Sequence, residues 1–68
     1  MNLKINGNDR DIQDNTILVE LIEKLTGEKD PAGVAVAING SVVSRSLWAQ
    51  QALSEGDDIE ILGAVSGG

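Results

Sequence analysis

The strongest constraint on this chain's fold is a single amphipathic segment set among short segments of alternating polarity. Its apolar residues follow the i, i+3, i+4, i+7 spacing of one helix face: Leu18, Leu21, Ile22 and Leu25. A lone helix of this length is not stable in water, so its apolar face must pack against another element. The rest of the sequence offers strands instead of further helices. We therefore expect an α+β domain with this helix across one face of a sheet.

The expected strands are alternating or apolar segments that end at turn residues. They fall at 1–5, 10–13, 34–38, 42–43 and 58–62. Asn-Gly pairs at 6–7 and 39–40 predict tight turns, because both residue types tolerate positive φ. The alternation also predicts the side chains that face the helix: Leu3, Ile5, Ile12, Val34, Val36, Ile38, Ile59 and Ile61. Residues 44–53 fit neither pattern and are expected to form a loop with a helical turn.

The ends of the helix are predicted from capping residues. Asp14, Asn15 or Thr16 is expected to cap the first turn by accepting a hydrogen bond from an unpaired backbone N–H. Gly27 is expected to end the helix as its C-cap residue.

The composition requires a core held by apolar packing alone, most of it from aliphatic side chains. The chain has 68 residues and neither cysteine nor histidine, which excludes disulfides and the usual ligands of a structural zinc site. Trp48 is the only aromatic residue. We expect a single domain over 1–68, with 64–68 as a flexible C-terminal tail.

The net charge of −6 limits the classes of partner. Nucleic acids and anionic membranes both attract basic proteins, so neither is expected to bind this chain. An acidic surface suits a basic protein partner, and the alternative is that the charge only maintains solubility. The sequence shows no signal peptide and no membrane-spanning segment, so we expect a cytoplasmic protein.

Catalysis by this chain alone is not expected. Without histidine or cysteine it lacks the commonest general base and the strongest nucleophile. Its serines, at 41, 44, 46, 54 and 66, have no evident activating partner. The acids at 57, 58 and 60 do not match a calcium-loop pattern, and no glycine-rich phosphate loop precedes the helix. We therefore predict no catalytic and no metal-binding residue.

One strand leaves an apolar side chain on the side away from the helix. If Ile59 and Ile61 point inward, Leu62 points outward, together with Ala35 and Ala37 in the expected neighbouring strand. With Ala64 just beyond it, Leu62 would form an exposed apolar area beside the C-terminus. We predict that Leu62 and Ala64 contribute to docking of a partner; neutral exposure is the alternative.

The C-terminal Gly67-Gly68 is the remaining candidate for chemistry. Glycine has no Cβ, so such an end passes through a slot too narrow for a side chain. It then presents an unhindered carboxylate, which another protein can activate by attack on the α-phosphorus of ATP. A sulfur or amine nucleophile can displace the resulting adenylate. The alternative is a terminus with no role.

A series of motifs runs in order over essentially the whole chain: LKING at 3–7, TILVEL at 16–21, VAVAING at 34–40, Val42-Val43, Arg45, Trp48, LSEGD at 53–57, Ile59-Glu60-Ile61, Val65 and Gly67-Gly68. These motifs resemble those of the ThiS family, the sulfur carriers of thiamine biosynthesis. The resemblance implies a ubiquitin-like β-grasp fold, a mixed sheet of four to five strands with one main helix across it.

The resemblance also implies partners and roles. A ThiF-type enzyme, using ATP and magnesium, would adenylate Gly68. A persulfide donor would convert the carboxylate to a thiocarboxylate, and a ThiG-type thiazole synthase would take the sulfur. The chain itself would bind no cofactor and would be monomeric when free. Gly67 matches the slender penultimate position, and Val65 and Ser66 match the tail approach.

Two residues depart from the family pattern, and three other functions stay open. Ser66 stands where a longer polar residue is common, and Ser44 where a proline often follows the Val-Val pair. Neither departure touches the reactive end. The alternatives are a MoaD-type small subunit of molybdopterin synthase, a ubiquitin-like modifier conjugated through Gly68, and a binding module with an incidental tail.

Overall fold

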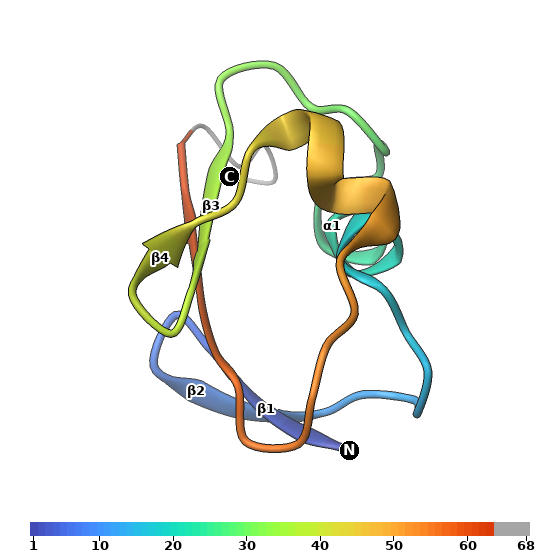
Figure 1. The fold of residues 1–68 in the computed structure, drawn as a ribbon, viewed down its shortest axis with the longest axis vertical. Coiled ribbons are helices and arrows are strands. Elements are labelled where there is room, and N and C mark those ends of the chain that lie inside the picture. Colours follow the sequence, from blue (N-terminus) through green and yellow to red (C-terminus); the bar gives the residue numbers. More distant parts are fainter. Residues whose placement is uncertain (64–68) are drawn as a thin grey trace.

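A computed structural model describes residues 1–63 of the chain. They form one five-stranded sheet with an α-helix on one face and a 3-10 helix beside it (Figure 1). The elements, in order, are β1 (Asn2–Ile5), β2 (Asn8–Asp11), α1 (Leu18–Thr26), β3 (Ala35–Ile38), β4 (Ser41–Val42), η1 (Arg45–Gln50) and β5 (Asp58–Leu62). The expected α+β class with one main helix is confirmed. The predicted flexible tail, 64–68, lies outside the described residues.

The sheet has β5, the last strand of the described residues, in its middle. The strand order is β2-β1-β5-β3-β4. β1 and β2 form one antiparallel hairpin, and β3 and β4 form the other. β5 joins them by pairing parallel to β1 and antiparallel to β3 (Figure 1).

The core lies between the sheet and α1, as the alternation predicts. Seven of the eight residues expected to face the helix are buried, and the eighth, Ile38, is partly buried against them. From the helix, Leu18, Leu21 and Ile22 are fully buried, while Leu25 packs at the edge of the core. The described residues contain no buried polar or charged side chain, so the core is apolar throughout.

The return strand of the first hairpin begins earlier than predicted. The sequence indicated 10–13, whereas β2 covers Asn8–Asp11. Asn6 and Gly7 form a two-residue turn, with φ of 50° and 85°, so Asn8 pairs directly with Ile5. The β2 residues are all exposed and polar, so this strand carries no apolar alternation to reveal it.

The start of α1 also differs from the prediction. None of the three expected residues caps the helix; the N-cap position is Ile17. Its backbone N–H donates to Glu20 Oε1 over 3.0 Å. Asp14 instead accepts a hydrogen bond from the Met1 amine, and the Thr16 hydroxyl donates to the Gln13 carbonyl. Gly27 ends the helix as expected, with φ 86°.

The ambiguous segment contains a regular element that supplies part of the core. η1 buries Trp48 to 2% exposure, and its indole Nε1 donates to the Val43 carbonyl over 3.1 Å. Leu53, which follows η1, is also buried. Within residues 1–63, no helix is long and apolar enough to cross a membrane.

Candidate docking surface at the end of the last strand

The sheet face away from α1 carries an exposed apolar patch. Cross-strand pairs share a face, so the pairs Ala35–Leu62 and Ala37–Val42 place four apolar side chains together. Val42 is 80% exposed and Leu62 is 59% exposed. We call Ala35, Ala37, Val42 and Leu62 the outer apolar patch. The two alanines project little, so another protein can approach the sheet closely there.

The structure confirms that Leu62 is exposed on the outer face, and it adds Val42. The sequence pointed to the pair Val42-Val43 without assigning either a face. The two-residue turn at Asn39-Gly40 sets the register that places Val42 opposite Ala37. The Asn39-Gly40 turn was therefore the sequence signal that could have placed Val42 on the outer face.

Acidic side chains flank the outer apolar patch along the same sheet face. Glu60 lies opposite Ala37, and Asp58 shares its face because alternate residues of β5 point the same way. Next to Asp58 comes Lys4 in β1, and opposite Lys4 lies Asp9 in β2. This face therefore combines an apolar centre with an acidic flank, which complements a partner with an apolar contact and basic residues.

Two asparagine side chains bind β5, one near each end. Asn6 Oδ1 accepts from the Ile61 N–H over 2.7 Å, and its Nδ2 donates to the Ile61 carbonyl over 3.3 Å. Asn39 Oδ1 accepts from the Asp58 N–H over 3.0 Å, and its Nδ2 donates to Asp57 Oδ1 over 3.0 Å. β5 is thus held by side chains as well as by its ladders. Sequence reasoning identified both turns but not these contacts.

The predicted reactive residues lie outside the described residues. They are Gly68, Gly67, Ser66 and Val65, together with the predicted docking residue Ala64. Their roles stay predictions. The structure describes the segment that leads to them: β5 ends at Leu62, which belongs to the outer apolar patch, and Gly63 follows.

Over residues 1–63 there is no group of three acidic, histidine or cysteine side chains that could hold a metal ion. Within the same residues, two pKa values are shifted. The Asp14 carboxylate raises the pKa of the Met1 amine, and that amine lowers the pKa of Asp14. Neither group belongs to the outer apolar patch.

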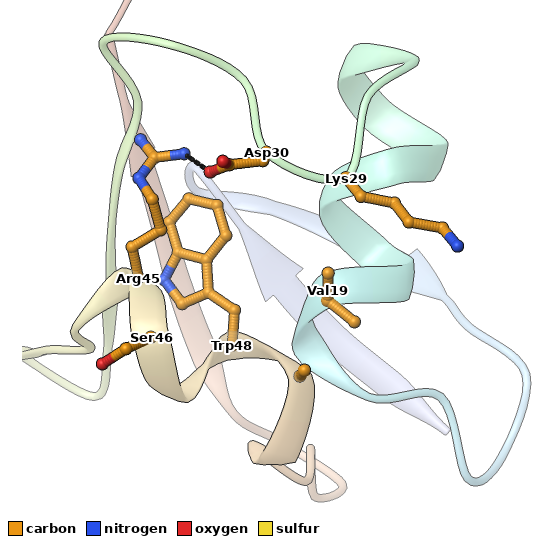
Figure 2. A pocket seen from close by; sticks show the side chains of 7 residues that line it. Val19, Lys29, Asp30, Arg45, Ser46 and Trp48 are labelled. Carbon is orange, nitrogen blue, oxygen red and sulfur yellow. Dashed lines mark hydrogen bonds and ion pairs between the residues drawn. The ribbon is translucent and has the colours of Figure 1, made fainter.

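A pocket of about 590 Å³ lies between α1, η1 and the loop after α1 (Figure 2). It is lined by Val19, Lys29, Asp30, Arg45, Ser46, Trp48 and Ala49. In Figure 2 the Arg45 side chain extends over the Trp48 ring toward Asp30. These three lining residues therefore contact one another on one side of the pocket.

Comparison with known proteins places the chain in a family. The model of the ThiS family matches residues 3–68. The sulfur carrier protein ThiS of Escherichia coli (strain K12) is 41% identical over 49 residues, which is 72% of this chain and 71% of that protein. The crystal structure of the thiamine biosynthesis protein ThiS from Geobacter metallireducens matches with a TM-score of 0.81 at 28% identity, covering all of both chains. The solution structure of a thiamine biosynthesis protein from the same organism matches with a TM-score of 0.76 at 27% identity, covering all of this chain and 88% of that one.

The family match, the identity to a ThiS protein and the likeness of the folds point to the same family. The chain belongs to the ThiS family, and its fold is the ubiquitin-like β-grasp of that family.

Proposed function

We propose that this chain is a sulfur carrier of thiamine biosynthesis that carries sulfur on the C-terminal carboxylate of Gly68. The observation that carries the proposal is the outer apolar patch, which reaches Leu62 just before the segment that ends in Gly67-Gly68. Membership of the ThiS family supports it, and a curated relative is named as a sulfur carrier. The chain is a substrate of other enzymes and not itself an enzyme.

The first step activates the carboxylate in a partner of the ThiF type, which uses ATP and magnesium. A carboxylate oxygen of Gly68 attacks the α-phosphorus, pyrophosphate leaves, and the terminus becomes an acyl-adenylate. Glycine at 67 suits this step because it lets the end enter a narrow channel without a side chain. Val65 and Ser66 form the approach to that channel.

The second step replaces the adenylate with sulfur. The terminal sulfur of a persulfide attacks the acyl carbon, AMP leaves, and an acyl disulfide forms. A thiol then attacks the donor's sulfur, forming a disulfide there and releasing the thiocarboxylate. A thiazole synthase of the ThiG type receives the sulfur. The need for ATP and thiols fits the cytoplasm as the compartment.

The outer apolar patch, which includes Leu62, is the proposed docking surface for these partners, and Ala64 is proposed to contribute to docking as well. The acidic side chains next to it, Glu60 and Asp58, favour an enzyme surface with basic residues and accelerate encounter with it. Because the patch is exposed in the free protein, docking requires no rearrangement of the core.

The test is the intact mass of the protein after incubation with ATP, its adenylating enzyme and a persulfide source. We expect a gain equal to one oxygen replaced by sulfur, which fragmentation assigns to Gly68. A variant lacking Gly68 should fold normally and show no gain. If the unmodified chain gained nothing while the same enzymes acted on another carrier, the sulfur-carrier proposal would fail and conjugation through the tail would become the better hypothesis.

A further inference from the structure

Gly63 lies in direct backbone contact with the loop that precedes β3. Its φ is 129°, in the region that favours glycine. A Cβ at this position would lie 2.1 Å from the Gly33 carbonyl oxygen and 3.0 Å from Val34 Cα. Both are backbone atoms, so no side-chain rotation could relieve the overlap. The contact therefore requires glycine at 63, immediately before residues 64–68.

Arg45 holds the other side of this contact in place. Its Nη2 donates to the Val34 carbonyl over 2.8 Å, and its Nη1 pairs with the Asp30 carboxylate. The guanidinium carbon lies 4.6 Å from the centre of the Trp48 ring. Figure 2 shows these two side chains next to each other. Trp48 is buried in the core, so Arg45 connects the loop at Gly33-Val34 to the core.

The contact between Gly63 and Gly33 lies directly beside the outer apolar patch. Ala35 and Leu62 form the last pair of the β3–β5 ladder and belong to that patch. Gly63 is the next residue, and its contact with Gly33 sets where the chain leaves the sheet. The five residues from 64 to 68 span at most about 18 Å when extended. A partner docked on the patch therefore receives the terminus at a reach that depends on this starting point.

We propose that Gly33, Val34, Arg45 and Gly63 form a tail seat, which fixes the start of residues 64–68 relative to the docking patch. The proposal rests on the proposed function, because the tail seat would align the terminal carboxylate with the adenylating site of the enzyme docked on the patch. Arg45 and Gly63 are thus positioning residues. They set the geometry of activation without touching the reacting atoms.

The main test is Gly63→Ala, with Gly56→Ala as the matched control. Gly56 also has a positive φ, 83°, but a Cβ there would meet no atom within 4 Å. Both variants therefore carry backbone strain, and only Gly63→Ala disturbs the tail seat. The readout is carrier-dependent exchange between ATP and pyrophosphate by the adenylating enzyme, with kcat and KM for the carrier measured well below each melting temperature.

Gly63→Ala should lower kcat at least about tenfold, because small misplacements of a reacting group are costly, while KM changes little. Docking uses the outer apolar patch, which this variant retains. Gly56→Ala should keep both parameters. An unchanged kcat for folded Gly63→Ala, in an assay where the unmodified carrier is active, would overturn the tail seat and leave the sulfur-carrier proposal standing.

Arg45→Lys and Arg45→Ala provide a second test that does not alter the tail segment. Lysine retains a charge for Asp30 but lacks the planar fork with which arginine also reaches the Val34 carbonyl. We expect kcat to be highest for the unmodified protein, lower for Arg45→Lys and lowest for Arg45→Ala, with similar KM for all three. If Gly63→Ala does not fold, this series decides, and a folded Arg45→Ala with unchanged kcat refutes the proposal. No exchange with the unmodified carrier would refute the proposed function and the tail seat together.

Discussion

The two Asn-Gly turns share sequence and backbone conformation but bind opposite ends of one strand. Asn6 and Asn39 have φ of 50° and 51°, and each is followed by a glycine at 85°. The side chain of Asn39 binds the start of β5 in an exposed position, whereas that of Asn6 binds Ile61, near its end, in a partly buried one. The local sequence predicts the turn, but the strand that lies beside it decides what the asparagine does.

The largest loss of stability is expected for a substitution in the core, on which both turns depend. Leu21 is fully buried beneath the sheet, so Leu21→Ala should cost about 2–5 kcal/mol of unfolding free energy. Chemical denaturation would measure the loss, and hydrogen exchange at Asp58 and Ile61 should accelerate together because the domain unfolds as a unit. Faster exchange at only one of these amides would show that the two ends of β5 are separable.

The Asn6 contact should be the stronger of the two anchors. Asn6→Gly keeps a residue that accepts positive φ and removes both side-chain hydrogen bonds to Ile61. The partly buried N–H of Ile61 then lacks its acceptor. We expect a loss of about 1–3 kcal/mol, measured by denaturation.

Asn39→Gly is the matched comparison, because it removes an asparagine at nearly the same φ. Its hydrogen bonds are exposed, so water replaces them and the loss should be about 0.5–1 kcal/mol. An equal or larger loss than for Asn6→Gly would contradict the ranking of the two turns.

A charged anchor at the start of β1 should respond to pH, unlike the two amide anchors. The hydrogen bond and charge of the Met1 amine lower the pKa of Asp14, so its contribution is present above pH 3.8 and is lost as pH falls through the lower folded value. The pKa of the amine is raised from 8.0, so its contribution is complete below pH 8 and is lost as pH rises through the higher folded value.

Asp14→Asn should therefore differ most in melting temperature from the unmodified protein between these two limits. The difference should be small and should shrink with salt, because the pair is exposed. Asn6→Gly and Asn39→Gly should show differences that do not vary over this range. A melting-temperature difference for Asp14→Asn that stays constant with pH would exclude the charge pair as an anchor.

The smallest effect on stability is expected on the outer face of β5. Leu62→Asp removes an exposed side chain and should change the unfolding free energy by less than about 0.5 kcal/mol. Binding to the adenylating enzyme, measured by calorimetry, should weaken strongly because the change places a charge in the apolar patch. A large stability loss with unchanged binding would show that Leu62 serves the core instead.

The predictable parts of the molecule were those with strong local patterns. Alternation and the turn before it identified β5 with its correct bounds, and helix spacing identified the buried face of α1. β2 was placed two residues late because its residues are all polar, and the cap of α1 was wrong because Glu20 reaches back to Ile17.

Residues of the candidate site could be predicted from the sequence only where their position follows from the pattern of a single strand. Leu62 followed from alternation within β5, whereas Val42 needed the register of a hairpin. The contact between Gly63 and Gly33 joins residues far apart in the chain, and nothing in either local sequence reveals it. The same holds for Arg45, whose partners lie in a loop on the other side of β3.

The central place of β5 has a consequence for synthesis of the protein. A ribosome releases both hairpins and α1 before the strand that joins them, so the sheet stays in two separate parts until the chain has been made past Leu62. Long-range pairing of this kind comes late in folding. A prematurely terminated chain would lack the middle of its sheet along with the segment that follows. An enzyme that recognises the folded patch would therefore bind finished molecules and reject fragments.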